Sequence, residues 1–330
     1  MKLLKKLCSF LLILLLLSGC GSGGARKYTA YTVYPLGYLL NRIGGNHIVP
    51  VAVQNSDLVQ CSIPVSDFES ILKDSIYLFH IGELEPYLDV YKEAIDNSEV
   101  KVIDLSTLNA IYRFQRYTAV SAGNNQTFIE SPYYDGECFD IIDTYADDLF
   151  LWLDPIGMLS MAKDITATLS SNYVEQSAYF NENLKTLENN LIALDASYQN
   201  LANRLKKENR SIAFVSMTAS FGCWQKAYGF KVYPVCLSRY GTLPTAEQLA
   251  LIKERIIKDG VEYIAYEPNM TDEMIVLFKE LEAELGLKRI NLSNISSLTF
   301  SQQSENKDYL SLMYENLGVL ESISSLESKE

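Results

Sequence analysis

The sequence predicts an α/β protein of two lobes, each built on a parallel sheet, joined by one long helix. Short β-rich runs alternate with helical runs from Lys27 to Leu105, and the same alternation restarts after Arg210. Strands that alternate with helices favour a parallel sheet with helices on both faces. Between the two regions, large apolar residues recur at spacings of three and four, which is the period of one face of a helix.

The first lobe is expected over residues 28–172. Its first strand is predicted from Tyr28 to Pro35, and the helix that follows is expected to stop at Gly44 and Gly45. The later elements of this lobe are expected as strands over 47–53, 75–82 and 100–105, and as helices over 66–74 and around 86–95.

The connecting helix is expected over residues 173–208. Its apolar stripe consists of Leu184, Leu187, Leu191, Leu194, Tyr198, Leu201 and Leu205. Such a stripe can form a coiled-coil dimer, or it can pack along both lobes of its own chain. Three heptads are short for a coiled coil, so we favour intramolecular packing and a monomer.

The second lobe is expected over residues 209–330. Its predicted strands cover 211–217, 231–237, 261–267 and 288–293. Three helices are predicted between them: one that ends at Tyr228, one over 246–259 and one over 272–285. Because this order repeats that of the first lobe, two similar lobes are the simplest interpretation.

The N-terminus has the pattern of a signal peptide over residues 1–19. Three lysines precede an apolar run from Leu7 to Leu17 that is too short to span a bilayer stably. The run ends in Leu-Ser-Gly-Cys20, which resembles a bacterial lipobox and implies cleavage before Cys20 and a lipid on its sulfur. Residues 20–27 are then a flexible tether, and the protein is expected on the extracytoplasmic face of a cell membrane. An unprocessed signal anchor is the alternative.

The composition excludes a nucleic-acid binder. Removing residues 1–19 takes away three lysines and no acid, which changes the formal net charge from -13 to -16. A chain this acidic does not bind nucleic acid by neutralising phosphates.

The mature cysteines do not form a recognised motif. Cys61, Cys138, Cys223 and Cys236 contain no C-x-x-C pair, so a zinc ribbon or thioredoxin-type motif is absent from the sequence. Disulfides and buried free thiols both remain open for them.

Several segments resemble the metal-type solute-binding lipoproteins of bacterial ABC transporters, the zinc and manganese family. They are YTVYPLGYLLNRIGGNHIVPV at 31–51, SDFESILKDSIYLFHIGELEPYLD at 66–89, WLDP at 152–155, FGCWQKAYGF at 221–230 and DYLSLMYENLGVL at 308–320. The resemblance covers essentially the whole mature chain. It implies a metal-type periplasmic-binding-protein-like fold, with parallel four-stranded sheets in two lobes and a rigid helix between them. It also implies a zinc or manganese ion carried between the lobes and a membrane permease as partner.

The resemblance further implies four metal donors, which fall on residues that bind metals poorly. Counted along the motifs, the donor positions fall on Gln60 or its neighbour Val59, and on Phe150, Thr218 and Ser293. Divalent zinc and manganese favour imidazole, thiolate and carboxylate donors. The chain has only two histidines, His47 and His80, and the motif places both in or at strands, away from the donor positions.

Three interpretations of the cleft remain open. Other donors could hold a metal, namely Cys61, Asp148, Cys223 and Glu267. Alternatively, aromatic and hydroxyl side chains could line a pocket for a non-metal ligand, or could simply fill the space between the lobes so that no solute binds. The residues expected at this rim are Tyr133, Tyr134, Phe150, Trp152, Thr218 and Trp224.

No catalytic motif argues for an enzyme. The sequence contains no G-x-S-x-G elbow, P-loop or H-E-x-x-H pair. The sequence therefore predicts a lipid-anchored solute-binding protein of an ABC transporter.

Overall fold

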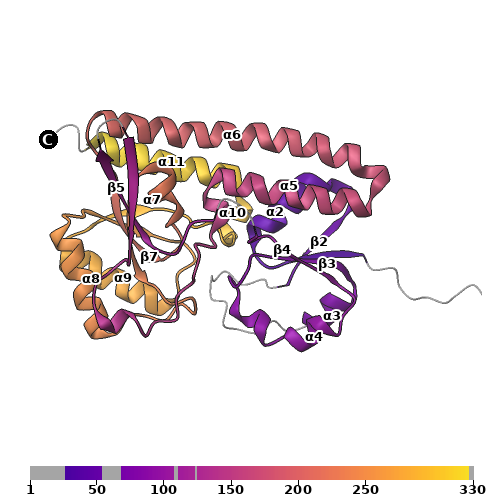
Figure 1. Ribbon diagram of the computed structural model, residues 1–330, viewed down its shortest axis with the longest axis horizontal. Coiled ribbons are helices and arrows are strands. Elements are labelled where there is room, and N and C mark those ends of the chain that lie inside the picture. The colour runs from indigo at the N-terminus through magenta and orange to yellow at the C-terminus, as the bar shows by residue number, and fades with distance from the viewer. Residues whose placement is uncertain (1–26, 54–67, 108–110, 123–124, 327–330) are drawn as a thin grey trace, which may run out of the picture.

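Two parallel four-stranded sheets form the two lobes of the computed structural model (Figure 1), which describes residues 27–53, 68–107, 111–122 and 125–326. The strand orders are β2-β1-β3-β4 and β10-β9-β7-β8. Since both sheets place the first strand of the lobe between the second and the third, the two lobes share one topology. The predicted fold class is confirmed. The predicted signal peptide and Cys20 lie outside the described residues.

The first sheet and its helices follow the predicted order. The elements are β1 (Tyr28–Tyr31), α2 (Tyr34–Gly44), β2 (Val49–Ala52), α3 (Phe68–Lys73), β3 (Ser75–His80), α4 (Lys92–Asp96) and β4 (Lys101–Asp104). Two boundaries were wrong. Tyr34 and Pro35 were expected to end the first strand and instead begin α2. His47 was expected to begin a strand and instead ends a 3-10 turn, Gly45–His47. Gly45 adopts φ 52°, a left-handed conformation open to glycine, which turns the chain before the strand can start.

The second lobe also matches its predicted elements. They are β7 (Ala213–Thr218), α7 (Cys223–Tyr228), β8 (Lys231–Cys236), α8 (Ala246–Lys258), β9 (Tyr263–Tyr266), α9 (Asp272–Leu285) and β10 (Lys288–Asn291). Thr245 and Gln248 form a capping box that starts α8. After a short helix, α10 (Phe300–Ser304), the helix α11 (Tyr309–Leu326) closes the fold.

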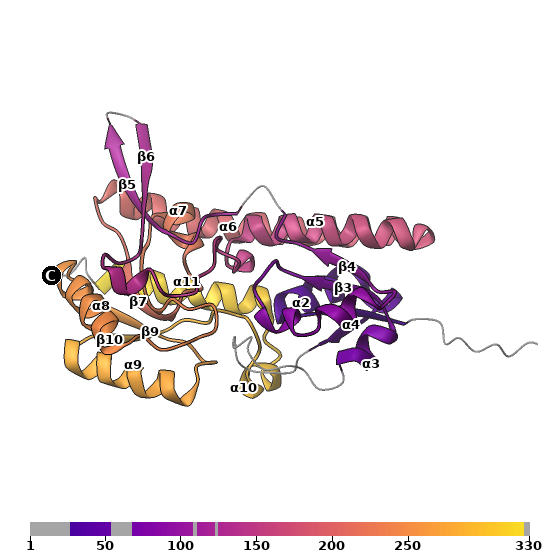
Figure 2. The ribbon, with the colours of Figure 1, turned by 60° about the horizontal axis from the view of Figure 1, so that its bottom comes forward.

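A β-hairpin that the sequence did not predict projects from the second lobe (Figure 2). Its strands, β5 (Arg116–Ala122) and β6 (Asn125–Ser131), pair antiparallel. The chain beyond it also packs on the second lobe, where Tyr134 Oη donates to Pro234 O at 2.8 Å and Gln248 Nε2 donates to Cys138 O at 2.6 Å. Part of the segment assigned from the sequence to the first lobe, 28–172, therefore belongs to the second by its contacts.

The helices α5 (Pro155–Asn172) and α6 (Ser177–Lys207) connect the lobes, and α6 runs along both (Figure 1). Asp154 caps α5 by accepting a hydrogen bond from Ile156 N at 2.9 Å. The predicted stripe from Leu187 to Leu205 is buried, and α6 packs on α2, α5 and α11. This packing confirms the intramolecular interpretation of the stripe. Among the helices of the described chain, none has the length and apolar character needed to cross a membrane.

Shortening one buried leucine of α6 tests its structural role. Leu194 is fully buried, whereas Ile192 on the same helix is 50% exposed. We expect Leu194→Ala to lower the free energy of unfolding by about 2–5 kcal/mol because it leaves a cavity, and Ile192→Ala to change it by less than about 0.5 kcal/mol. Urea unfolding followed by circular dichroism measures both. Similar losses in the two variants would contradict the packing of α6.

Candidate ligand cleft

The positions that the motifs matched to metal donors lie where the two lobes meet. Phe150 precedes the 3-10 turn Leu151–Leu153, Thr218 ends β7, and Ser293 follows β10. In parallel α/β sheets the carboxyl ends of strands are the usual place for ligands. Gln60 and Cys61 lie outside the described residues.

Phe150 is part of an aromatic cluster. Its side chain is 3% exposed, and its ring centroid lies 5.2 Å from that of Trp152 and 6.3 Å from that of Tyr145. A phenyl ring has no lone pair to give a metal ion, so this position contributes packing to the cleft.

Thr218 is bound to a buried carboxylate of its own lobe. Glu267 accepts hydrogen bonds from Thr218 N at 2.9 Å, from Thr218 Oγ1 at 2.5 Å and from Asn294 Nδ2 at 2.9 Å. Burial raises the pKa of Glu267, while these hydrogen bonds act in the opposite direction. The Glu267 carboxylate is therefore occupied by hydrogen bonds within the second lobe.

Ser293 lies in a loop whose backbone is fixed by hydrogen bonds to other parts of the chain. Asn316 binds both backbone groups of Ser293, accepting from its N and donating to its O, each at 2.8 Å. The next residues are tied to the other half of the molecule, because Trp152 Nε1 donates to Asn294 O at 2.7 Å and Tyr34 N donates to Ser296 O at 3.1 Å.

Two of the possible substitute donors, Asp148 and Cys223, come together in the core. Burial raises the pKa of Asp148 to about 7, and the backbone N–H groups of Phe150 and Cys223 oppose that rise. Burial and the nearby Asp148 and Asp154 hold the pKa of the Cys223 thiol well above its usual value. Metal ligation needs thiolates and carboxylates. Glu267, bound in its own lobe, does not join this pair.

Within the described ranges, no group of three or more His, Cys, Asp or Glu side chains could hold a metal ion. His47 packs edge-on against Tyr179, with ring centroids 4.8 Å apart, and His80 Nδ1 lies 3.1 Å from Gly82 O. Cys138, Cys223 and Cys236 are free thiols.

The prediction of an aromatic rim was wrong for most of its members. Tyr133, Tyr134, Trp152 and Trp224 are buried, and each makes a hydrogen bond within the core. Trp224, for example, donates through Nε1 to Leu153 O at 2.8 Å. Trp152 lies between the lobes, whereas Tyr134 and Trp224 pack mainly inside the second lobe, with ring centroids 5.4 Å from Phe139 and 4.9 Å from Phe221. All four fill core volume, which was the simpler alternative for them.

A small cavity of about 40 Å³ remains beside Phe150 and Thr218. Its walls also include Tyr145, Cys236, Arg239, Asn269 and Met274. The space would hold a few water molecules. Its lining is uncharged apart from Arg239.

Arg239 ties the two lobes together above this cavity. Its Nη1 lies 3.1 Å from Glu83 Oε2 of the first lobe, and its Nε lies 2.9 Å from Asp143 Oδ2. Tyr145 adds a hydrogen bond from its Oη to Leu84 O at 3.0 Å. Sequence reasoning missed Arg239, Tyr145 and Asn269, since none stands in a motif and their meeting depends on how the lobes pack.

Comparison with known proteins gives a consistent result. A family model described as zinc-uptake complex component A, periplasmic, matches residues 30–323. The zinc-binding protein AdcA of Streptococcus pyogenes is 27% identical over 288 residues, which are 83% of this chain and 52% of the relative. The high-affinity zinc uptake system protein ZnuA of Bacillus subtilis is 26% identical over 177 residues, 54% of this chain and 53% of the relative. The chain thus spans about half the length of these relatives.

Solved structures resemble the fold. The Zn(II)-bound ZnuA-like domain of Streptococcus pneumoniae AdcA superimposes with a TM-score of 0.65 at 20% identity, covering 90% of this chain and 98% of that one. The periplasmic zinc-binding protein TroA of Treponema pallidum gives a TM-score of 0.68 at 15% identity, with coverage of 89% and 98%.

The buried Asp148 makes stability depend on pH. Its pKa is about 7 in the fold against 3.8 for an ordinary aspartate, so the folded protein holds this proton more tightly than the unfolded chain. This contribution to the free energy of unfolding is present at acidic pH and is lost as the pH rises through about 7. We expect Asp148→Asn to make the decline less steep and to be more stable than the wild type at mildly alkaline pH by on the order of 1 kcal/mol.

The neighbouring exposed Asp147 supplies the control for this prediction. Asp147→Asn should leave the pH dependence of thermal unfolding as in the wild type. Burial also raises the pKa of Glu85 to about 8, so part of the decline should remain in Asp148→Asn. A decline as steep in Asp148→Asn as in the wild type would contradict our assignment of Asp148 as a titrating group.

Proposed function

The chain belongs to the family of periplasmic A components of zinc-uptake complexes, and we propose that it is the extracytoplasmic solute-binding subunit of an ABC transporter. The family match includes both sheets and the helix α6 between them. The relatives are named for zinc binding and zinc uptake. A cleft between two α/β lobes, at the carboxyl ends of their strands, supports a binding role.

The cargo is held without the donor set that the family resemblance implied. Phe150 carries this proposal, because it places a buried ring where a nitrogen donor is needed. Thr218 offers only a hydroxyl, which is already bound to Glu267. Zinc and manganese are the cargo expected from the resemblance, and a non-metal solute is the alternative. The cavity beside Phe150 and Thr218 has room for only a few water molecules, so either cargo would need the cleft to widen.

The protein is anchored to the outer face of the membrane in this proposal. The support is the lipobox-like pattern at Cys20 behind an apolar run of signal-peptide length. A relative from Streptococcus pneumoniae is named a zinc-binding lipoprotein.

A membrane permease is the proposed partner, and the subunit acts as a monomer. The apolar stripe of α6 supports a monomer, since it is buried within the chain. We assign neither catalysis nor nucleic-acid binding, because the family consists of transport components and the net charge is -13.

Elemental analysis with native mass spectrometry tests the cargo. We expect protein purified from its own host to carry no stoichiometric zinc or manganese, because the described cleft lacks a donor cluster. One zinc ion per chain that survives dialysis would contradict the proposed cargo. A bound organic mass would identify the solute.

A single histidine should not restore a metal site. We expect Phe150→His to bind zinc no more tightly than about 1 μM by calorimetry, since Thr218 and Ser293 still offer hydroxyls. Phe150→Leu serves as the control for the lost ring. Nanomolar zinc affinity in Phe150→His alone would show that our assignment of the other donor positions is wrong.

A further inference from the structure

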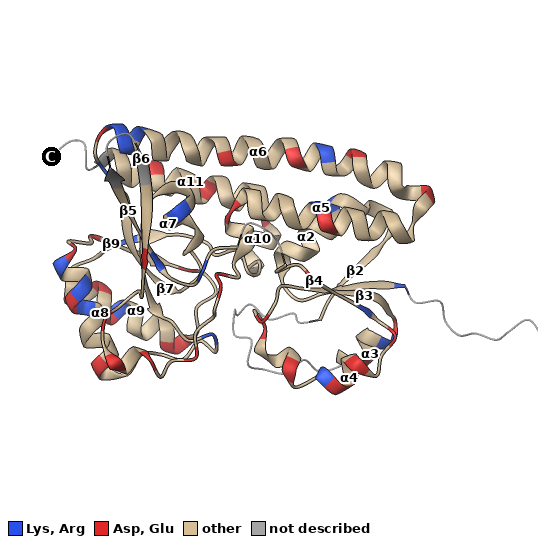
Figure 3. Cartoon of the chain, viewed as in Figure 1, with Lys and Arg blue, Asp and Glu red and all other residues tan. Residues whose placement is uncertain are grey.

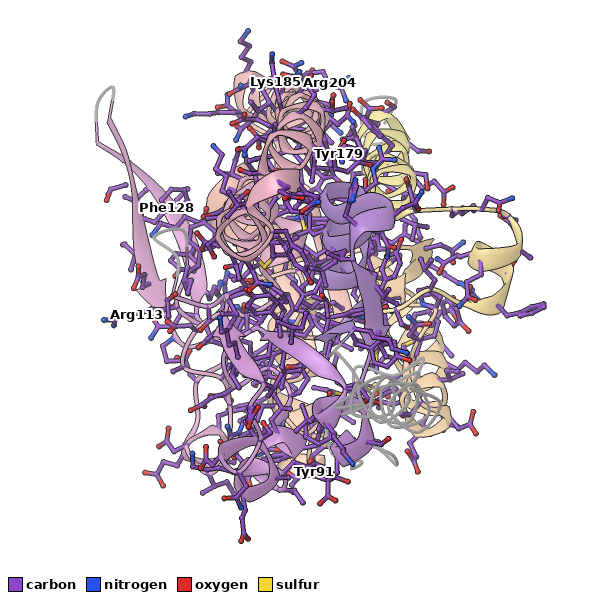
Figure 4. The ribbon with its side chains drawn as sticks, turned by 90° about the vertical axis from the view of Figure 1, so that its right-hand side faces the viewer. Tyr91, Arg113, Phe128, Tyr179, Lys185 and Arg204 are labelled. Carbon is purple, nitrogen blue, oxygen red and sulfur yellow. The ribbon has the colours of Figure 1, made fainter. Side chains whose placement is uncertain are left out.

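A second and much larger concave site lies outside the cleft. It is a groove of about 680 Å³ between the hairpin β5–β6, the last turns of α6, and α7. Figure 4 shows Phe128 on the projecting hairpin and Arg204 on α6, the two elements that flank it. A volume of this size is ordinary for a small-molecule site.

The groove has the opposite charge to the rest of the molecule. Five cationic side chains line it, and none of its described lining residues is Asp or Glu; the five are Arg116, Lys206, Arg210, Lys226 and Lys231. The whole chain carries a formal charge of -13. Figure 3 shows basic residues on α7 and at the end of α6, away from the acidic segments of the first lobe.

Carboxylates at the margin of the groove pair with three of the five cations. Asp259 Oδ2 lies 3.2 Å from Arg116 Nη2 but also 2.7 Å from Arg255 Nε, so one carboxylate serves two guanidinium groups. Glu208 pairs with Arg210 at 2.9 Å. The third pair is long, with Lys226 Nζ 3.8 Å from Glu130 Oε1.

Local contacts hold two of the cations in place. Lys226 Nζ lies over the rings of Tyr112 and Tyr117, 5.5 and 5.0 Å from their centroids. The Arg116 guanidinium lies 5.5 Å from the ring centroid of Tyr233. Because rings and ion pairs restrict these side chains, less conformational entropy is lost when they bind a ligand.

We propose that this groove binds a multiply charged oxyanion, of which an organic polyphosphate is the simplest class. Several cations spread along one groove favour a ligand with several charges over a single anion. Amide side chains on the same walls can bind its neutral part; these are Gln199, Asn203 and Asn209. The site is separate from the cargo cleft, so the proposal does not depend on the cargo.

One of the five cationic side chains, Lys206, has a structural role that needs no ligand. Lys206 lies in the last turn of α6, where a cation is favourable to the helix dipole whether or not a ligand binds. The test therefore uses Lys231, which begins the strand β8 and is exposed.

Calorimetry of the metal-free mature protein with tripolyphosphate tests the proposal. We expect saturable binding of tripolyphosphate at low ionic strength. This binding should weaken at physiological ionic strength, where the Debye length is about 8 Å. Orthophosphate should bind much more weakly than tripolyphosphate. Lys231→Glu should weaken tripolyphosphate binding by about tenfold, because the change replaces an attraction with a repulsion. Thermal unfolding of each variant confirms that it is folded.

The matched control is Lys288→Glu. Lys288 begins β10, the opposite edge strand of the same sheet, is also exposed, and does not line the groove. Its substitution gives the same change in net charge and should leave the affinity within about twofold. Equal weakening of tripolyphosphate binding in both variants would show that only the net charge matters, and it would overturn the proposal. The absence of saturable binding to the wild type would also overturn it.

Discussion

The burial of residues 150–153 between the lobes is the constraint on which the rest of the structure depends. Trp152 donates to Asn294 O of the second lobe, and its own carbonyl accepts from Tyr309 Oη at 2.6 Å. Leu153 O accepts from Trp224 Nε1. Each of these polar groups is buried, and leaving one unpaired would cost about 1–3 kcal/mol. The segment therefore has one register between the lobes, which puts Phe150 in the cleft and Asp154 at the start of α5.

The buried side chains of Phe150 and Trp152 change which interactions hold the two lobes together. A metal ion would draw donors from both sides by charge, whereas here the chain supplies its own hydrogen bonds and the guanidinium of Arg239 between Glu83 and Asp143. Glu267 shows the cost of a carboxylate in such a place, since burial disfavours its charge and Thr218 and Asn294 offset that penalty. In this structure the contacts between the lobes are thus made by groups of the chain itself.

The order of strands and helices could be predicted because each buried element carries its own period, as the stripe of α6 does. The hairpin β5–β6 was missed, since one face of it is solvated and its sequence resembles a polar loop. The absence of strong donors at Phe150 and Thr218 followed from the motifs. The burial of Trp152 and Trp224 did not, because whether a ring lines a cleft or fills it depends on the distance between lobes. The meeting of Arg239 with Glu83 is likewise a tertiary contact with no local signal.

The unbroken course of α6 along both lobes limits how the molecule can move. Hinge motion needs a few residues that absorb a large backbone rotation, and α6 continues without a break from Ser177 to Lys207 while packing on α2, α5 and α11. Opening the lobes like a jaw would bend this helix or strip its buried leucines. Access to the cavity beside Phe150 and Thr218 therefore depends on the side chains in its walls, such as Arg239 and Tyr145, rather than on a hinge in α6.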